Sequence, residues 1–138
     1  MANECVFCKI VSGELPSTKI YEDATVLVFM DINPLEEGHA LVIPKEHLDP
    51  ITNVPDNILK EIIVVAKKIA AAQLTGLNAV GVNITQANGS GAGQEVPHVH
   101  FHVIPRYSSD PKKANWKTRK YKSAEQMNQI ADLINKAL

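Results

Sequence analysis

The stretch His98-Val99-His100-Phe101-His102 places three of the chain's five histidines at alternate positions. Side chains alternate between the two faces of a β-strand, so a strand here puts the three imidazoles on one face. Val99 and Phe101 then point the other way, into a core. Imidazole has the side-chain pKa closest to neutral pH and suits nucleophilic, acid–base or metal chemistry. The row therefore predicts a chemically active face on one strand of a sheet.

Apolar runs and turn residues around this row predict the rest of the fold. The expected strands lie at 19–31 (two strands around a turn, the second at 25–30), 39–43, 80–85 and 96–104. Pro105 is expected to end the last of them. A long helix is expected from Pro55 to Gly76, and the capping box at 123–126 predicts a C-terminal helix. Because short links favour antiparallel pairing, we expect an α+β fold: a five-stranded antiparallel sheet with one long helix and a C-terminal helix.

Apolar residues at helical spacing mark the face of the long helix that is expected to pack on the sheet. That face comprises Leu59, Ile62, Ile63, Ala66, Ile69, Ala70 and Gln73 or Leu74. The charged residues between them, Lys60, Glu61, Lys67 and Lys68, are expected to face solvent.

The size and composition of the chain fit a single domain spanning residues 1–138. The chain is 45% hydrophobic and 21% charged, enough to form a sizeable core. Its net charge of −1 gives no overall argument for a nucleic-acid or membrane partner. No segment has the length of a membrane span, and no signal peptide is expected at the N-terminus. Since two cysteines are also too few for a secreted disulfide framework, a cytoplasmic location is expected.

One segment departs from this balanced charge. Half of the chain's 14 basic residues lie between Arg106 and Lys122. We expect a basic loop at 106–122, followed by the C-terminal helix at 123–138. A solvated surface loop is one reading of this segment.

The segment Cys5-Val6-Phe7-Cys8 has the CxxC spacing of half a zinc site. One or two histidines, such as His39 and His47, could complete a Cys2His2 site. Two free thiols and a redox pair are the alternatives, although a redox CxxC belongs at a strand-to-helix junction. Zinc–nitrogen bonds are about 2.1 Å, and the outer two histidines of the row are about 13 Å apart along a strand. A single ion therefore cannot use all three imidazoles of the row.

Two further features lie near the histidines. The glycine-rich segment 88–94 leads into the row, and its backbone N–H groups could approach an anion closely. It is not a Walker A motif, since no Gly-Lys-Ser/Thr follows. Asp31 ends an apolar strand before Asn33-Pro34. It is either a turn residue or a carboxylate that accepts hydrogen bonds from a ribose diol.

The segment from His98 to Ile104 resembles the signature of the histidine triad (HIT) family of nucleotidyl hydrolases and transferases. Cys5–Ile10, Asp31–Pro34, Gly38–Lys45 and Ala92–Gln94 resemble further family segments in the same order. The resemblance covers roughly residues 5–106.

This resemblance implies a two-step covalent mechanism. His100 matches the family nucleophile, which attacks the α-phosphorus of a nucleotide to form a nucleotidyl-imidazole. Water then releases the nucleoside monophosphate. The mechanism requires a neutral His100 whose other nitrogen donates to a backbone carbonyl. By the same resemblance, His102 would hold the phosphoryl oxygens and His39 would complete the cluster.

The resemblance also implies a nucleotide-binding set. Asp31 matches the residue that binds the ribose hydroxyls, while Gln94 and the Gly93 region match the neighbourhood of the α-phosphate. Many members have Asn or Gln two residues before Gly89, where this chain has Ala87, so Asn88 is the candidate there. The apolar wall around the base is implied to be Phe7, Ile10, Leu15, Phe29 and Ile32.

In zinc-bearing members the first triad histidine ligates the metal. This implies a site made by Cys5, Cys8, His47 and His98. Four protein ligands close the coordination shell of zinc, so its role would be structural.

Glu95 departs from the family pattern, because well-known members have Ser or Thr there, near the leaving group. A carboxylic acid could protonate an amine or phosphate leaving group, and it would repel a polyphosphate. The ending Ile104-Pro105-Arg106 looks more like the dinucleoside-polyphosphate-hydrolase and general microbial branches than the phosphoramidase branch. By this resemblance the basic segment 106–122 could reach the distal phosphates of such a substrate, and the reading as a solvated surface loop stays open.

We therefore expect a hydrolase that cleaves at the α-phosphorus of a dinucleoside polyphosphate, a nucleoside phosphoramidate or a related adenylate. A purine preference and a homodimer are implied by the family. The alternatives are a zinc-stabilised nucleotide-binding or scaffold protein with weak turnover, and a metallohydrolase with two triad histidines on a catalytic zinc.

Overall fold

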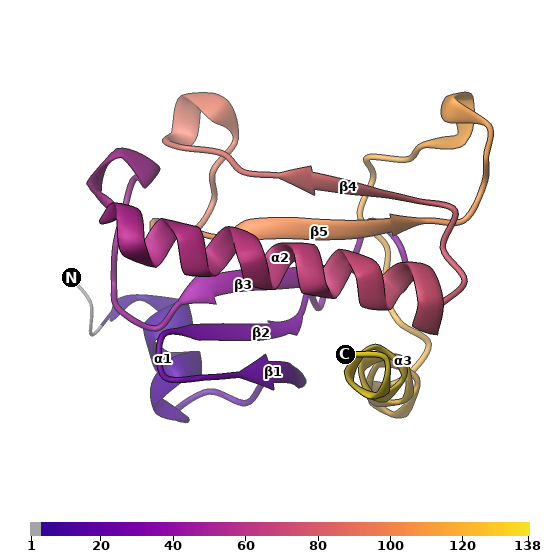
Figure 1. Ribbon diagram of the computed structural model, residues 1–138, viewed down its shortest axis with the longest axis horizontal. Coiled ribbons are helices and arrows are strands. Elements are labelled where there is room, and N and C mark those ends of the chain that lie inside the picture. Colours follow the sequence, from indigo (N-terminus) through magenta and orange to yellow (C-terminus); the bar gives the residue numbers. More distant parts are fainter. Residues whose placement is uncertain (1–3) are drawn as a thin grey trace.

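A five-stranded antiparallel sheet forms the centre of the structure, a computed structural model that describes residues 4–138 (Figure 1). The strand order is β1-β2-β3-β5-β4. The strands are β1 Lys19–Glu22, β2 Val26–Met30, β3 Ala40–Pro44, β4 Gly81–Thr85 and β5 Phe101–Arg106. The helices are α1 Val6–Ser12, α2 Asp56–Gly76 and α3 Ala124–Lys136, with short 3-10 turns η2 Ile51–Asn53, η3 Ser90–Ala92 and η4 Pro111–Lys113. The α+β class and the five-stranded antiparallel sheet are confirmed.

The sequence predicts no signal peptide at the N-terminus, and the first three residues of that segment, 1–3, lie outside the described residues. Within residues 4–138, no helix is both long and apolar enough to cross a membrane.

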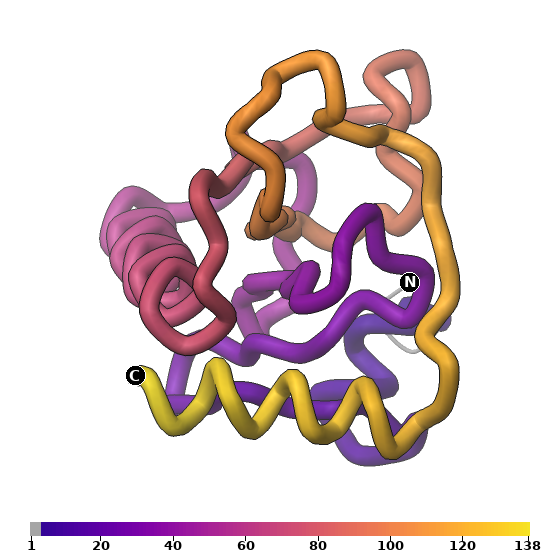
Figure 2. Tube along the Cα trace, turned by 90° about the vertical axis from the view of Figure 1, so that its right-hand side faces the viewer, coloured from indigo at the N-terminus to yellow at the C-terminus, as the bar shows by residue number. Residues whose placement is uncertain are grey.

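The two faces of the sheet carry separate apolar cores. Helices α2 and α3 pack on one face, over Val28, Val42 and Val103. Helix α1 packs on the other, where Phe7 meets Phe29 and its neighbours. In Figure 2, α2 lies to the left and the segment 106–122 descends on the right, on the face opposite α2. All five residues of β2 are buried because this strand is covered on both faces.

Helix α1 was not expected from the sequence, because seven residues are too few to show a helical period. Its ends are well defined. The Cys5 Sγ accepts from the backbone N–H of Cys8, and Gly13, at φ +87°, closes the C-terminal end with its N–H on the Ile10 carbonyl. The helix brings the two cysteines together at its N-terminal end.

The expected strand 96–104 is wrong at its first residues. Strand β5 begins at Phe101, so the first two histidines of the row precede it. The chain is bent there, and the N–H of Val99 donates to the Leu48 carbonyl at 2.8 Å instead of to a sheet neighbour. Val99 and Phe101 nevertheless point into the core against α2, which confirms the expected separation of the two faces.

Pro105 lies inside β5 and does not end it. Strand β3 pairs with β5 only as far as Val103, and beyond it Pro105 is paired with Val82 of β4. With no partner on the β3 side, one backbone edge needs no N–H, so proline is tolerated there.

The expected buried face of α2 is also wrong at one residue. Ile63 is 44% exposed, whereas Val65 is buried in its place. Gln73 is fully buried, and its Nε2 donates to the carbonyls of Gly38 and Val103 at 3.0 and 2.9 Å. The helix is therefore rotated slightly from the pattern read from its apolar residues.

The C-terminal helix begins as its capping box predicts. The Ser123 Oγ accepts from the N–H of Gln126 at 3.1 Å. The Gln126 Oε1 in turn accepts from the N–H of Lys122 at 2.8 Å, one residue before the expected partner.

The glycine before His39 provides a test of this packing. Gly38 adopts φ +101°, and a Cβ there would collide with Leu77 and come within 3.2 Å of the Pro105 ring. Gly13 has a similar positive φ but open space around it. Both alanine substitutions carry a backbone cost of about 1–2 kcal/mol, because a Cβ is disfavoured at positive φ. Gly38→Ala is expected to lose a further 1–3 kcal/mol, roughly the cost of overpacking, measured by urea unfolding. Equal losses in the two variants would contradict this.

Candidate active site and metal-binding cluster

A cavity of about 650 Å³ opens on the sheet face that carries α1. It collects residues from α1, the end of β2, the segment before β5, and the ends of β3 and β5. The predicted site residues that line it are Phe7, Ile10, Leu15, Phe29, Asp31, Ile32, His39, Gly93, Gln94, Glu95, His100 and His102. The structure thus gathers nucleotide-binding and catalytic candidates from distant parts of the chain.

Asn88 is not among the residues that line the cavity. Its Oδ1 accepts from the backbone N–H of Ile51 at 2.8 Å, and its amide is hydrogen-bonded to Gln86. The Gln94 side chain also supports the loop, since its Oε1 accepts from Gly89 and its Nε2 donates to Asp49 at 2.7 Å.

Phe7 forms the wall between the apolar end of the cavity and the histidines. Its ring lies edge-on to Phe29, with centroids 5.4 Å apart, and edge-on to His100 at 5.0 Å. Edge-to-face contacts of this kind fix ring positions. An apolar slot lined by Phe7, Ile10 and Phe29 therefore lies beside the His100 imidazole.

His100 has its tautomer set by the backbone. Its Nδ1 lies 2.7 Å from the His98 carbonyl oxygen, and because a carbonyl only accepts, Nδ1 must carry the proton. Burial lowers the pKa of His100, so the ring is neutral near pH 7. The Nε2 lone pair is then available for attack, as the sequence interpretation requires.

A chain of hydrogen bonds determines the tautomers of the other two catalytic candidates among the histidines, His39 and His102. The backbone N–H of Leu35 donates to the His39 Nδ1 at 3.0 Å, so the neutral His39 carries its proton on Nε2. That Nε2 lies 2.9 Å from the His102 Nδ1 and donates to it. His102 consequently presents an Nε2–H donor. The Asp31 Oδ2 is 3.6 Å from the His39 Nε2.

Burial is the main cause of the unusual pKa values here. It lowers the pKa of His39 to about 3, assisted by the charges of His102 and Arg106. It also lowers the pKa of His102 to about 4, assisted by His100. Burial raises the pKa of Asp31, and the neighbouring Glu95 charge raises it further. The imidazoles are therefore neutral at physiological pH.

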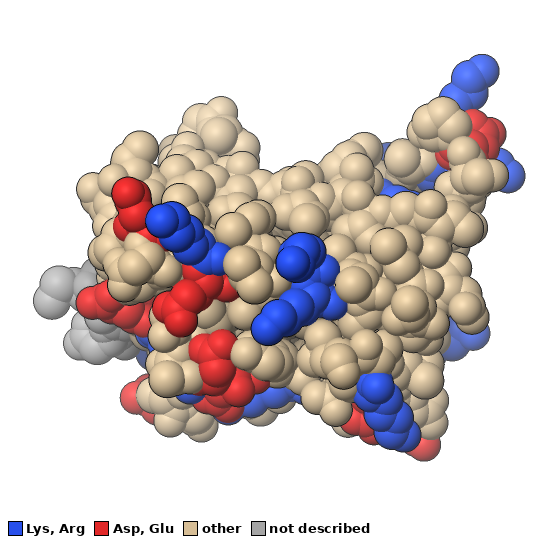
Figure 3. All heavy atoms as spheres, in the orientation of Figure 1, with Lys and Arg blue, Asp and Glu red and all other residues tan. Residues whose placement is uncertain are grey.

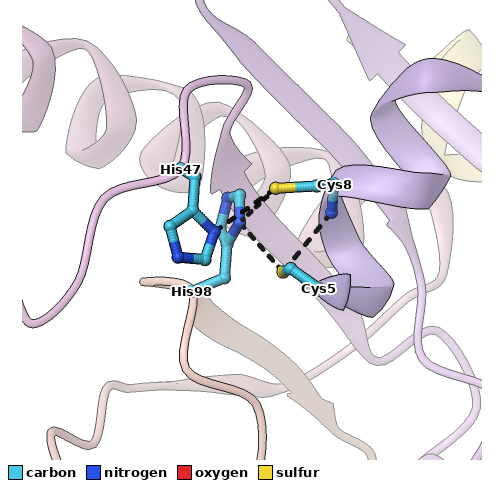
Figure 4. Close-up of side chains that lie close together, drawn as sticks. All are labelled: Cys5, Cys8, His47 and His98. Atoms are coloured by element: carbon cyan, nitrogen blue, oxygen red, sulfur yellow. Dashed lines mark hydrogen bonds between the residues drawn. The ribbon is translucent and has the colours of Figure 1, made fainter. Parts of the chain in front are cut away.

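A second cluster lies behind the cavity, where Cys5, Cys8, His47 and His98 converge (Figure 4). Their four donor atoms lie within 4.8 Å of one another. The Cys8 Sγ is 3.3 Å from the His47 Nδ1 and 3.6 Å from the His98 Nδ1, and the Cys5 Sγ is 3.5 Å from the latter. Tetrahedral zinc would set sulfur–nitrogen separations of about 3.6 Å, given its usual bond lengths. The donor set and its spacing are compatible with zinc.

The backbone also orients His98 in this cluster. Its Nε2 lies 2.8 Å from the Pro44 carbonyl and donates to it, which leaves the Nδ1 lone pair facing the thiols. A ligand histidine in a metal site commonly has such a partner on its second nitrogen.

Trp116 and Thr118 are among the lining residues that were not expected from the sequence. They belong to the segment 106–122, and no local pattern places that segment beside the histidines. Its first residue, Arg106, is buried, with its Nη1 on the Asn115 carbonyl at 2.7 Å, so it belongs neither to a solvated loop nor to the cavity wall.

The charge of the cavity wall is acidic. Among residues 4–138, its charged members are Asp31 and Glu95, and no lysine or arginine lines it. The basic residues of the segment 106–122 therefore do not provide a cationic wall for the cavity.

The family model for the HIT domain matches residues 12–109 of this chain. An uncharacterised HIT-like protein of Borreliella burgdorferi is 54% identical over 110 residues, covering 78% of each chain. An adenosine 5′-monophosphoramidase of Candida albicans is 44% identical over 106 residues, covering 74% of this chain and 70% of its own. A crystal structure of a zinc-bound histidine triad family protein from Mycobacterium smegmatis superposes with a TM-score of 0.88, at 37% identity, covering 99% of this chain and 94% of its own. The chain belongs to the HIT family.

The lowered pKa values of His39 and His102 predict how stability changes with pH. Both rings are protonated in the unfolded chain below about pH 6.5 but stay neutral in the folded chain to about 3 and about 4. The unfolded state therefore binds more protons in this range. The contribution of these two neutral rings to the free energy of unfolding should therefore be lost as pH falls from about 6.5 toward 4. Imidazole NMR signals of both residues should not titrate between about pH 7 and pH 5, and titration near 6.5 would contradict the assignment.

Proposed function

We propose that this chain hydrolyses nucleotides at the α-phosphorus through a nucleotidyl intermediate on His100. The observation that carries the proposal is the His100 ring, with Nδ1 bonded to a carbonyl at 2.7 Å and Nε2 left unprotonated at the cavity wall. Membership of the HIT family and the phosphoramidase name of the Candida relative support it.

The cavity is suited to hold a nucleotide with its base in the apolar slot between α1 and β2. Phe7, Phe29 and Ile10 would contact the base, and the Asp31 carboxylate would accept hydrogen bonds from the ribose hydroxyls. Asp31 lies beside the slot and also lines the cavity. This arrangement would place the α-phosphate at His100 and His102.

In the first step, the His100 Nε2 lone pair forms a bond to phosphorus as the bond from phosphorus to the leaving group breaks. The His102 Nε2–H donates to a non-bridging phosphoryl oxygen, where negative charge develops. Glu95 donates a proton to the leaving atom. In the second step, water attacks phosphorus, the phosphorus–nitrogen bond to His100 breaks, and Glu95 accepts the proton from water. The products are a nucleoside monophosphate and the protonated leaving group.

An amine is the leaving group that the electrostatics favour. Asp31 and Glu95 are the charged residues of the cavity wall among residues 4–138, and both are acids. The Asp31 carboxylate would repel a polyphosphate, whereas a protonated Glu95 would supply the proton that an amine needs. We therefore propose nucleoside phosphoramidates as the preferred substrates.

The alternative of a catalytic zinc on the triad receives less support. The His39 Nε2 and His102 Nδ1 are 2.9 Å apart, a hydrogen-bond distance. This contact uses the Nδ1 lone pair of His102, and the Nδ1 lone pair of His98 faces the thiols. Two triad histidines therefore do not present free lone pairs to one ion at the cavity. Measured hydrolysis rates distinguish the proposed hydrolase from a scaffold protein with weak turnover.

We propose zinc as a structural ion held by Cys5, Cys8, His47 and His98, a set that would fill its coordination shell. Zinc would join α1, the loop after β3 and the approach to β5. When bound, zinc would cross-link these segments, and it would have no open coordination position. The zinc-bound Mycobacterium structure supports this assignment.

A homodimer and a cytoplasmic location also remain proposals. Strand β4 is an edge strand, and apolar residues near it are exposed: Ile63 and Val64 on α2 at 44% each, and Ile84 on β4 at 42%. Figure 3 shows few charged side chains over β4 and the second half of α2. Such a surface suits a second copy of the chain.

The nucleophile is tested with a panel of adenylates that differ in leaving group: an amide, a sulfate and a second nucleotide. His100→Ala should lower kcat/KM on all of them by at least about 10³-fold, because it removes the attacking atom. Quenched wild-type reactions should contain adenylate on His100, detected by mass spectrometry. Activity that persists in a folded His100→Ala chain would refute the covalent mechanism.

Glu95→Gln should lower kcat/KM about 10²-fold or more on the amide and little on the sulfate, which leaves without a proton.

The zinc proposal predicts about one zinc ion per chain in metal analysis, as one four-ligand site requires. Cys8→Ser should lose that ion and lower Tm, because the link between α1 and the sheet is broken. Mild chelation that removes zinc should leave the rate per folded molecule nearly unchanged. Loss of activity on chelation, with the fold intact, would favour the metallohydrolase.

A further inference from the structure

Trp116 is the chain's single tryptophan, and it lines the cavity although it comes from the segment 106–122. Its side chain is 57% exposed. One face of its ring lies over the Arg106 guanidinium, 4.7 Å from the ring centroid. The indole ring is thus in contact with the guanidinium on one face and open to solvent elsewhere.

Arg106 fixes this ring in place. The guanidinium Nε donates to the Asn83 Oδ1 at 2.8 Å, and its Nη1 donates to the Asn115 carbonyl at 2.7 Å. The second contact holds the residue just before Trp116. A cation held on both sides and stacked on the indole stabilises this position of the ring.

The ring lies on the far side of the histidines from the base slot. Side chains of β5 at His102 and Arg106 share a face, about 13 Å apart along the strand. Across the sheet, the slot is over β2 and β3, whereas Arg106 is paired with Gly81 of β4. The order across the cavity is therefore base slot, histidines, Trp116.

Displacement at phosphorus places the entering and leaving atoms roughly in line on opposite sides. His100 is in contact with Phe7 of the base slot and with His102. With the base in the slot, the leaving group would be directed away from the slot, on the His102 side. That direction leads toward the ring carried by Arg106.

We propose that Trp116 is a specificity-determining residue that stacks on a flat aromatic ring carried by the leaving amine. The proposal rests on the hydrolysis proposed above and names its substrate class: nucleoside phosphoramidates of aromatic amines. The free indole face provides the stacking surface. The acidic residues of the wall, Asp31 and Glu95, favour an amine over an anionic leaving group.

The kinetic test compares adenosine 5′-phosphoramidates of 2-phenylethylamine and 2-cyclohexylethylamine, which have the same length but differ in the flatness of the ring. Wild type should favour the aromatic amine in kcat/KM by roughly three- to tenfold, the range that aromatic pairs provide. Trp116→Leu should reduce the ratio to about one, and Trp116→Phe should restore part of it. Tyr107→Leu removes a ring from the same segment outside this cavity and should leave the ratio unchanged.

A binding test uses the fluorescence of the single tryptophan in the His100→Ala chain, with calorimetry as the measure of occupancy. The phenylethyl phosphoramidate should change the emission, whereas AMP, which lacks the leaving group, should bind without changing it. An equal change with AMP means that Trp116 contacts the nucleotide itself, and this overturns the proposal.

The remaining outcomes separate the two proposals. Hydrolysis of both phosphoramidates with a ratio near one, or a ratio that persists in Trp116→Leu, overturns the role of Trp116 alone. No hydrolysis of either compound refutes the proposed function, and the emission test still decides whether an aromatic group reaches Trp116. Absence of binding by the phenylethyl compound overturns the Trp116 proposal as well.

Discussion

The hydrogen bond from the His100 Nδ1 to the His98 carbonyl is the constraint on which the site depends. A buried imidazole has two possible neutral tautomers, and their chemistry differs because only an unprotonated nitrogen can attack or ligate. The carbonyl decides between them for His100. Backbone groups decide in the same way for His39, through the N–H of Leu35, and for His98, through the Pro44 carbonyl.

Burial and these backbone partners act together. A protonated imidazole is costly where burial removes its hydration, so burial keeps the rings neutral. The neutral rings can then form directed hydrogen bonds with one another, as His39 and His102 do at 2.9 Å. Burial also disfavours the charged form of the carboxyl group in the cavity, and it raises the pKa of Asp31. The site therefore combines neutral imidazoles with acids whose charge is not balanced by a lysine or arginine on the cavity wall of residues 4–138.

How much the sequence could predict depends on whether a residue's position follows from its neighbours along the chain. The alternation of the histidine row determined its face, even though β5 begins later than expected. The glycines and prolines near strand ends gave the approximate element boundaries. Trp116 could not be predicted, because its position depends on contacts of Arg106 with β4 and with Asn115. The placement of Asn88 away from the cavity likewise depends on a long-range bond, to the N–H of Ile51.

His98 links the two clusters. Its ring nitrogen faces the cysteines while its carbonyl receives the proton of His100, so a shift of this one residue would disturb both. Phe7 makes a second link, since it lies between the two cysteines in the sequence and packs edge-on against both His98 and His100. An ion bound by the Cys–His set would therefore hold the carbonyl and the aromatic ring that position the attacking imidazole. Because the Pro44 and His98 carbonyls already hold the His98 and His100 rings, the ion would add stability to the arrangement without any contact with the substrate.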